Sequence, residues 1–203
     1  MLTRALYTTV EVWMLIEYFS NKILKYICNK KVIDNDEIDV YKYGIEITLS
    51  SVLNIFLILI IAAATNTLSV GIVFLIVFIS VRKYTGGFHA DTYLTCNLTF
   101  VCCYMLVLIL LRINFMQNVI IHISMILMCF LTILFLCPIE NKNKKIVNKR
   151  KMKIISFFAY LFWYAVSVAF IYINPILSRG ILFTLYLITG LAIIGFLKER
   201  RLL

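Results

Sequence analysis

Charged side chains are scarce in this sequence. Asp, Glu, Lys and Arg make up 15% of its 203 residues, whereas hydrophobic residues make up 63%. A soluble domain of this length would be about one quarter charged. The scarcity excludes an ordinary water-soluble domain and predicts an all-α, polytopic membrane protein. Because the chain is too short for a second sizeable domain, we expect residues 1–203 to form one integral membrane domain.

Histidine, proline and glycine are also rare. The chain contains two histidines, two prolines and seven glycines. No His-Glu-x-x-His pattern or Gly-Lys-Ser phosphate loop occurs. The six cysteines show neither the spacing of a disulfide framework nor that of a zinc site. We therefore expect no metal and no cofactor.

Acidic residues are half as frequent as basic ones. Ten Asp and Glu oppose 20 Lys and Arg, which gives a net charge of +10. The cations lie in the gaps between apolar runs. Membrane topology and contact with anionic lipid explain this placement better than binding to nucleic acid does.

The apolar runs predict about six transmembrane or re-entrant helices over residues 43–197. No charged residue occurs from Ile47 to Val81. One helix of that length would measure about 52 Å, whereas the hydrocarbon core is about 30 Å thick. Two helices that turn at Thr65-Asn66-Thr67 fit better. The predicted spans are 43–64, 68–84, 97–112, 118–138, 154–174 and 180–197, with a basic loop over 140–153.

In residues 1–42, apolar residues recur at helical intervals, and charged residues interrupt them. This pattern is typical of an amphipathic helix that lies in the membrane interface. Two interpretations stay open, a helix packed on the bundle and a docking surface for a peptide substrate.

The Lys and Arg counts predict the orientation. With six spans and an inside N-terminus, 18 of these residues fall on one side and two on the other. The larger group divides into six in residues 1–42, two in 82–96, seven in 140–153 and three at the C-terminus. The positive-inside rule then predicts a multi-pass cell-membrane protein with both termini and segment 82–96 in the cytoplasm.

The polar segment Arg82–Cys96 carries the candidate chemistry. It contains His89, Cys96 and the adjacent Gly86-Gly87. An imidazole can take the proton of a thiol and then protonate a leaving amine, so Cys and His together suffice for attack on an amide. The alternative is a capped helix end with a surface histidine and an inert cysteine.

The spacing sets a geometric condition on this pair. On one straight helix, His89 and Cys96 would be separated by about 10.5 Å along the axis. A general base needs a contact of roughly 3 Å. The backbone must therefore bend between them, and Gly86-Gly87 supply the freedom to turn, including positive φ.

Arg82, Gly87, His89 and Cys96 match the pattern R-x4-G-x-H-x6-C without a gap. In this pattern the chain resembles the AgrB family, the membrane cysteine endopeptidases of accessory gene regulator quorum-sensing systems. Tyr43-Gly44-Ile45-Glu46, the chain length, the span count and the basic loop are also similar to the family.

The resemblance implies a thiol protease with a defined substrate. Cys96 would be the nucleophile and His89 the general base and acid, with Arg82, Gly86 and Gly87 in support. The partner would be an amphipathic AgrD-like propeptide, processed into a cyclic autoinducing peptide. Tail cleavage through an acyl-enzyme thioester would precede closure of a thiolactone or lactone. The resemblance also implies a homodimer.

Two questions stay open. Glu46 is expected near the cytoplasmic end of its span, where it could assist the site, form an ion pair with Arg82 or Lys83, or simply lie at the interface. From the residues alone, the alternative function is a non-enzymatic small membrane transporter or assembly partner with a basic cytoplasmic face.

Overall fold

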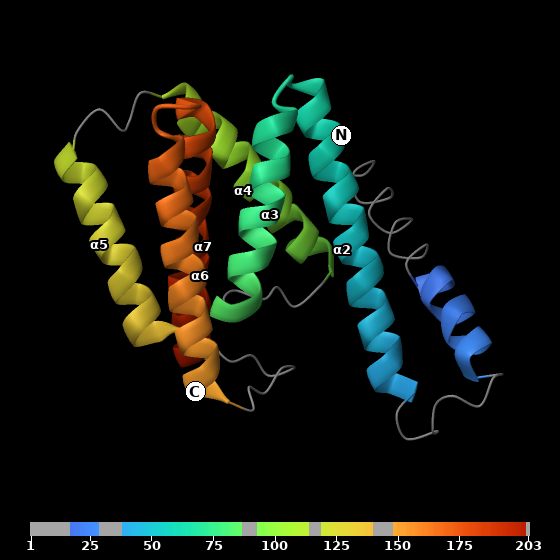
Figure 1. Cartoon of the computed structure of the whole chain (residues 1–203). Helices are drawn as coiled ribbons and strands as arrows, with labels where there is room; N and C mark the ends of the chain where they lie inside the picture. The colour runs from blue at the N-terminus through green and yellow to red at the C-terminus, as the bar shows by residue number, and fades with distance from the viewer. Residues whose placement is uncertain (1–16, 29–37, 87–92, 114–118, 140–147, 202–203) are drawn as a thin grey trace. The chain divides into compact units, whose positions relative to one another are not determined.

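The computed structural model describes residues 17–28, 38–86, 93–113, 119–139 and 148–201. These residues form helices and no strand, apart from one isolated bridge between Gly86 and Ile139. A helix over residues 17–28 precedes six labelled helices (Figure 1). They are α2 (Ile38–Ala64), α3 (Leu68–Thr85), α4 (Tyr93–Arg112), α5 (Val119–Leu136), α6 (Lys149–Phe170) and α7 (Pro175–Arg201).

Five helices of the described chain are long and apolar enough to cross a membrane. They are α2, α3, α6 and the segments Thr95–Arg112 of α4 and Pro175–Lys198 of α7. Helix α5 contributes a shorter apolar stretch, Met125–Leu136. The predicted all-α polytopic membrane fold is therefore confirmed.

The chain divides into two compact units. The first comprises Met1–Leu57 and Ala90–Val101, and the second comprises Ile58–His89 and Cys102–Leu203. Helices α2 and α4 each run through both units. The single domain expected from the sequence stays a prediction.

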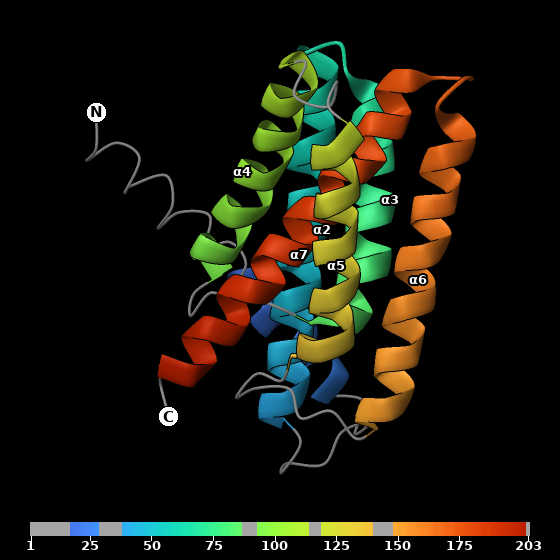
Figure 2. The same cartoon turned by 90° about the vertical axis from the view of Figure 1, so that its left-hand side faces the viewer.

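In the second unit, α7 is the central helix. It packs against α3, α5 and α6, and α6 also packs against α3 and α5. Figure 2 shows α5 crossing in front of α7, with α6 beside them. The buried side chains include Phe74, Tyr160, Phe183 and Leu185. Between membrane helices, such contacts stabilise through van der Waals packing and not through removal of apolar surface from water.

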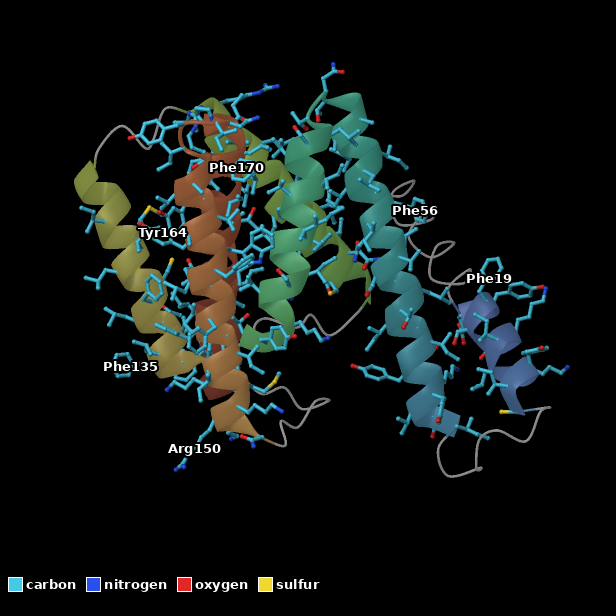
Figure 3. The ribbon with its side chains drawn as sticks, viewed as in Figure 1. Phe19, Phe56, Phe135, Arg150, Tyr164 and Phe170 are labelled. Atoms are coloured by element: carbon cyan, nitrogen blue, oxygen red, sulfur yellow. The ribbon has the colours of Figure 1, made fainter. Side chains whose placement is uncertain are left out.

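Aromatic rings and a part-buried hydroxyl join the helices of this unit. Phe130 of α5 contacts the rings of Phe157, Tyr160 and Tyr164 of α6, the last labelled in Figure 3. The Trp163 indole N–H donates to Ser80 Oγ at 2.8 Å and joins α6 to α3. This hydrogen bond satisfies two polar groups that water does not reach inside a bilayer.

The predicted turn at Thr65-Asn66-Thr67 is confirmed. Helix α2 ends at Ala64 and α3 begins at Leu68. Asn66 adopts a φ of 55°, which asparagine tolerates better than most residues. The Thr67 and Tyr104 hydroxyls are hydrogen-bonded at 2.8 Å and anchor the turn to α4.

Several helices extend beyond the predicted spans. Helix α2 begins at Ile38 and not at residue 43, α4 at Tyr93 and not at 97, and α7 at Pro175 and not at 180. Helix α6 begins at Lys149, inside the predicted basic loop, because the Asn148 side chain accepts from the Lys151 N–H at 3.0 Å. Lysine and arginine are good helix formers, so the helix extends beyond the boundary of the apolar segment.

Candidate active site

The polar segment of the sequence lies between α3 and α4. Helix α3 ends at Thr85, and α4 begins at Tyr93. Gly87 and His89 lie outside the described residues, so their roles and the contact of His89 with Cys96 stay predictions. Arg82, Gly86, Cys96 and Glu46 lie within the described residues.

Gly86 closes α3 in a conformation that requires glycine. Its φ of 71° and ψ of −146° lie in a region that only glycine adopts readily. Its N–H donates to the Arg82 carbonyl oxygen at 3.2 Å. A Cβ atom at this position would also collide with the carbonyl oxygen of Ile139. The positive φ expected at the glycine pair is thus confirmed for Gly86.

Arg82 lies one helical turn before Gly86, in the last turn of α3. Its guanidinium carbon is 5.1 Å from the centre of the Phe78 ring, and its side chain is half-buried. A cation above an aromatic ring is attracted by the negative face of that ring. The charge of Arg82 is therefore held close to the end of α3.

The end of the second unit that carries Arg82 is strongly basic. Figure 1 shows that α3, α5 and α7 end and α6 begins at this end, and Figure 3 shows Arg150 projecting from it. The cations in this group are Arg82, Lys83, Lys149, Arg150, Lys151, Lys153 and Lys198. The opposite ends of these helices and of α4 carry Arg112 and Arg179. The side of the membrane that the basic end faces stays a prediction.

Cys96 lies in the first turn of α4 and is half-buried. It belongs to the first unit. Cys103, Cys129 and Cys137 are buried, and Cys102 is exposed. Reactive cysteines are partly accessible, whereas buried ones are usually inert, which favours Cys96 over the three buried thiols.

Three polar side chains of the first unit meet at Asn97, the residue that follows Cys96 in the chain. Asn97 Oδ1 accepts hydrogen bonds from Ser50 Oγ and from Asn54 Nδ2 of α2, each at 2.8 Å. Ser50 and Asn54 are buried. Sequence reasoning missed this cluster. Its only signal was a pair of polar residues four positions apart in a run without charges.

Glu46 is half-buried and lies on α2, the helix that carries Ser50 and Asn54. The spacing of Glu46, Ser50 and Asn54 places all three on one face of α2. A carboxylate at this depth is costly and is usually functional. Its assistance to His89 stays a prediction, because His89 lies outside the described residues. Within the described chain, His, Cys, Asp and Glu do not gather in groups of three that could hold a metal.

Comparison with known proteins shows that a family model matches most of the chain. The model of the family described as "AgrB: Accessory gene regulator B" matches residues 20–195. This range includes Arg82, His89 and Cys96.

Two clostridial proteins are similar over most of their length. A Clostridium beijerinckii protein named "Putative AgrB-like protein" is 23% identical over 175 residues, which cover 85% of this chain and 86% of that protein. A Clostridium perfringens strain 13 protein named "Putative AgrB-like protein 2" is 24% identical over 145 residues, or 68% of each chain. No solved structure matches.

Proposed function

The chain belongs to the accessory gene regulator B family, and from this membership we propose that it is a membrane-embedded cysteine endopeptidase. Its substrate is an amphipathic AgrD-like propeptide, whose C-terminal tail it removes. The observation that carries the proposal is the family match across the segment that contains the R-x4-G-x-H-x6-C pattern. The homodimer implied by the resemblance stays a prediction.

The reaction begins at Cys96. His89 takes the thiol proton, and the sulfur adds to a backbone carbonyl carbon of the propeptide. A C–S bond forms, and the C–N bond to the tail breaks. The imidazolium of His89 protonates the leaving amine. The products of this step are the free tail and a thioester on Cys96.

A second acyl transfer closes the ring. A thiol or hydroxyl of the bound propeptide attacks the thioester carbonyl and displaces the Cys96 sulfur, which regains a proton. Exchange of one thioester for another is nearly thermoneutral, whereas hydrolysis is irreversible. The site must therefore exclude water, and a half-buried thiol in an apolar helix suits this requirement.

Charge complementarity supports the same substrate class. The basic end of the second unit attracts an acidic peptide tail and an amphipathic leader that lies on an anionic lipid surface. Arg82 lies at this end, one turn before Gly86. The positive-inside rule assigns this end to the cytoplasm, where thiols stay reduced.

The proposed activity is tested by co-expression with an AgrD-like propeptide, followed by mass spectrometry of the released tail. Cys96→Ala and His89→Ala should abolish release, because each removes one member of the pair. Cys102→Ala is the matched control, since this thiol lies on the same helix and is exposed. Tail release by Cys96→Ala at the wild-type rate would refute the assignment.

A further inference from the structure

The strongest unassigned feature is the hydrogen-bonded cluster of Ser50, Asn54 and Asn97. Both donors come from α2, and both act on the single oxygen Asn97 Oδ1, each at 2.8 Å. An amide oxygen has two lone pairs, so these two bonds use its full capacity. The two bonds hold the Asn97 side chain against α2, with its oxygen toward that helix.

This orientation leaves the Asn97 amide nitrogen available. Among the described residues, no acceptor takes a hydrogen bond from its two N–H groups. Side-chain hydrogen bonds polarise one another, so an amide whose oxygen accepts two bonds donates more strongly through its nitrogen. The cluster thus presents an oriented, unused donor on the residue next to Cys96.

The hydrogen bonding of Asn54 indicates that the cluster does more than join two helices. Asn54 is buried, with 8% of its surface exposed, and its Oδ1 has no hydrogen-bond partner. An unpaired buried polar atom costs about 1–3 kcal/mol. A cluster that only held α2 to α4 would not need this cost.

We propose that the Asn97 side-chain N–H groups bind the carbonyl oxygen of the scissile peptide bond, and that Ser50 and Asn54 are the positioning residues that orient them. This inference rests on the proposed function and adds a catalytic residue to it. Asn97 follows Cys96 directly in the first turns of α4, and both belong to one unit. The donor and the nucleophile are therefore carried by the same stretch of helix.

The chemistry of the acylation step requires such a donor. When Cys96 Sγ adds to the carbonyl carbon, the C–S bond forms and the carbonyl π electrons move to oxygen. The Asn97 N–H groups stabilise this negative charge without giving up a proton. When the C–N bond breaks, the electrons return to the carbonyl. Preoriented donors are most effective in a site of low dielectric constant, such as an apolar helix end.

The first test compares two substitutions of Asn97 in the full-length enzyme with an AgrD-like propeptide. Asn97→Ala removes the donor, and kcat should fall by about 10²–10³-fold with little change in KM. Asn97→Asp keeps an acceptor for Ser50 and Asn54 but loses the amide donor. This variant should unfold at the wild-type temperature and still lose kcat by a similar factor.

The second test addresses the positioning residues. Ser50→Ala should lower kcat several-fold in the wild-type background and have no further effect in Asn97→Ala, because Ser50 acts only through Asn97. Ser51→Ala is the matched control, since the Ser51 hydroxyl is exposed and donates to the Ile47 carbonyl oxygen of its own helix. This control should keep the wild-type kcat.

Two results would overturn the inference. One is wild-type kcat in Asn97→Asp, and the other is a raised KM with unchanged kcat in Asn97→Ala. Failure of the proposed function has a different signature. In that case the wild-type protein itself forms no acyl-enzyme at Cys96, whereas failure of the Asn97 role leaves the acyl-enzyme intact.

Discussion

The backbone N–H of Ile139 donates to the carbonyl oxygen of Thr85 across 3.1 Å. This hydrogen bond holds the residue that follows Pro138 against the last residue of α3. The contact fixes the end of α3, from which Gly86 follows. It also brings the Ile139 carbonyl so close to Gly86 that no side chain fits there.

Gly86→Ala should therefore disrupt the site. The strained φ alone costs roughly 1–3 kcal/mol, and the collision with Ile139 adds to this. We expect a lower unfolding temperature in detergent and loss of tail release.

Gly44→Ala is the control for this substitution. Gly44 lies within α2, and a Cβ atom there would meet nothing within 4 Å. Alanine should stabilise this helix by about 0.5–1 kcal/mol. Equal unfolding temperatures for the two variants would contradict the role given to Gly86.

The cysteines should differ in their reaction with a maleimide. Cys96 is half-buried, whereas Cys103, Cys129 and Cys137 are buried. The Cys137 thiol should stay unlabelled in the native protein because its side chain is buried.

Peptide mapping of the labelled protein would locate the modified thiols. We expect label on Cys96 in the native state, and label on the buried cysteines only after denaturation. Native labelling of Cys137 with Cys96 unmodified would show that the accessible thiol has been misidentified.

Ser167→Ala should loosen the contact between α6 and α7. The Ser178 hydroxyl donates to the Ser167 carbonyl oxygen at 2.8 Å, and the Ser167 hydroxyl donates to the Ser178 carbonyl oxygen at 3.1 Å. Hydrogen bonds between membrane helices contribute about 0.6 kcal/mol on average and up to about 1.7 kcal/mol. Thermal unfolding in detergent should show a small decrease in stability with tail release retained. A change above the upper value would mean that the substitution disturbs more than this pair.

Reporter fusions test the predicted orientation. A periplasmic phosphatase fused after Asn66 should be active, whereas one fused after Lys198 should be inactive, because the positive-inside rule assigns the basic end to the cytoplasm. A green fluorescent protein fused at the same two positions should give the opposite pattern. Phosphatase activity at Lys198 would show that the topology is the reverse of the predicted one and that Cys96 lies on the oxidising side.

The sequence predicted the helix order well because charge and polarity mark the ends of membrane spans. Within the uncharged run from Ile47 to Val81, Thr65-Asn66-Thr67 is the polar cluster that could turn two helices, and the turn occurs there. The start of α6 was missed because four of the five residues Lys149–Lys153 are charged, and yet lysine and arginine are good helix formers. A hydropathy pattern marks where lipid ends, not where the backbone hydrogen bonds end.

Contacts between distant residues could not be predicted from the sequence. Asn97 is separated from Ser50 by 47 positions, and their hydrogen bond depends on how α2 and α4 pack. The contact of Gly86 with Ile139 could not be predicted for the same reason. Residue pattern and spacing identified Cys96 and Gly86 as candidates. The cluster that holds Asn97 required the three-dimensional structure.

The most direct test of the central claim is to trap the acyl-enzyme. The purified protein would be mixed with an AgrD-like propeptide whose ring-closing residue is replaced by alanine, quenched with acid, and analysed by mass spectrometry. The account predicts a mass increase equal to the propeptide without its tail, located on the peptide that contains Cys96 and absent in Cys96→Ala. Tail release without this adduct, or an adduct on another cysteine, would contradict it.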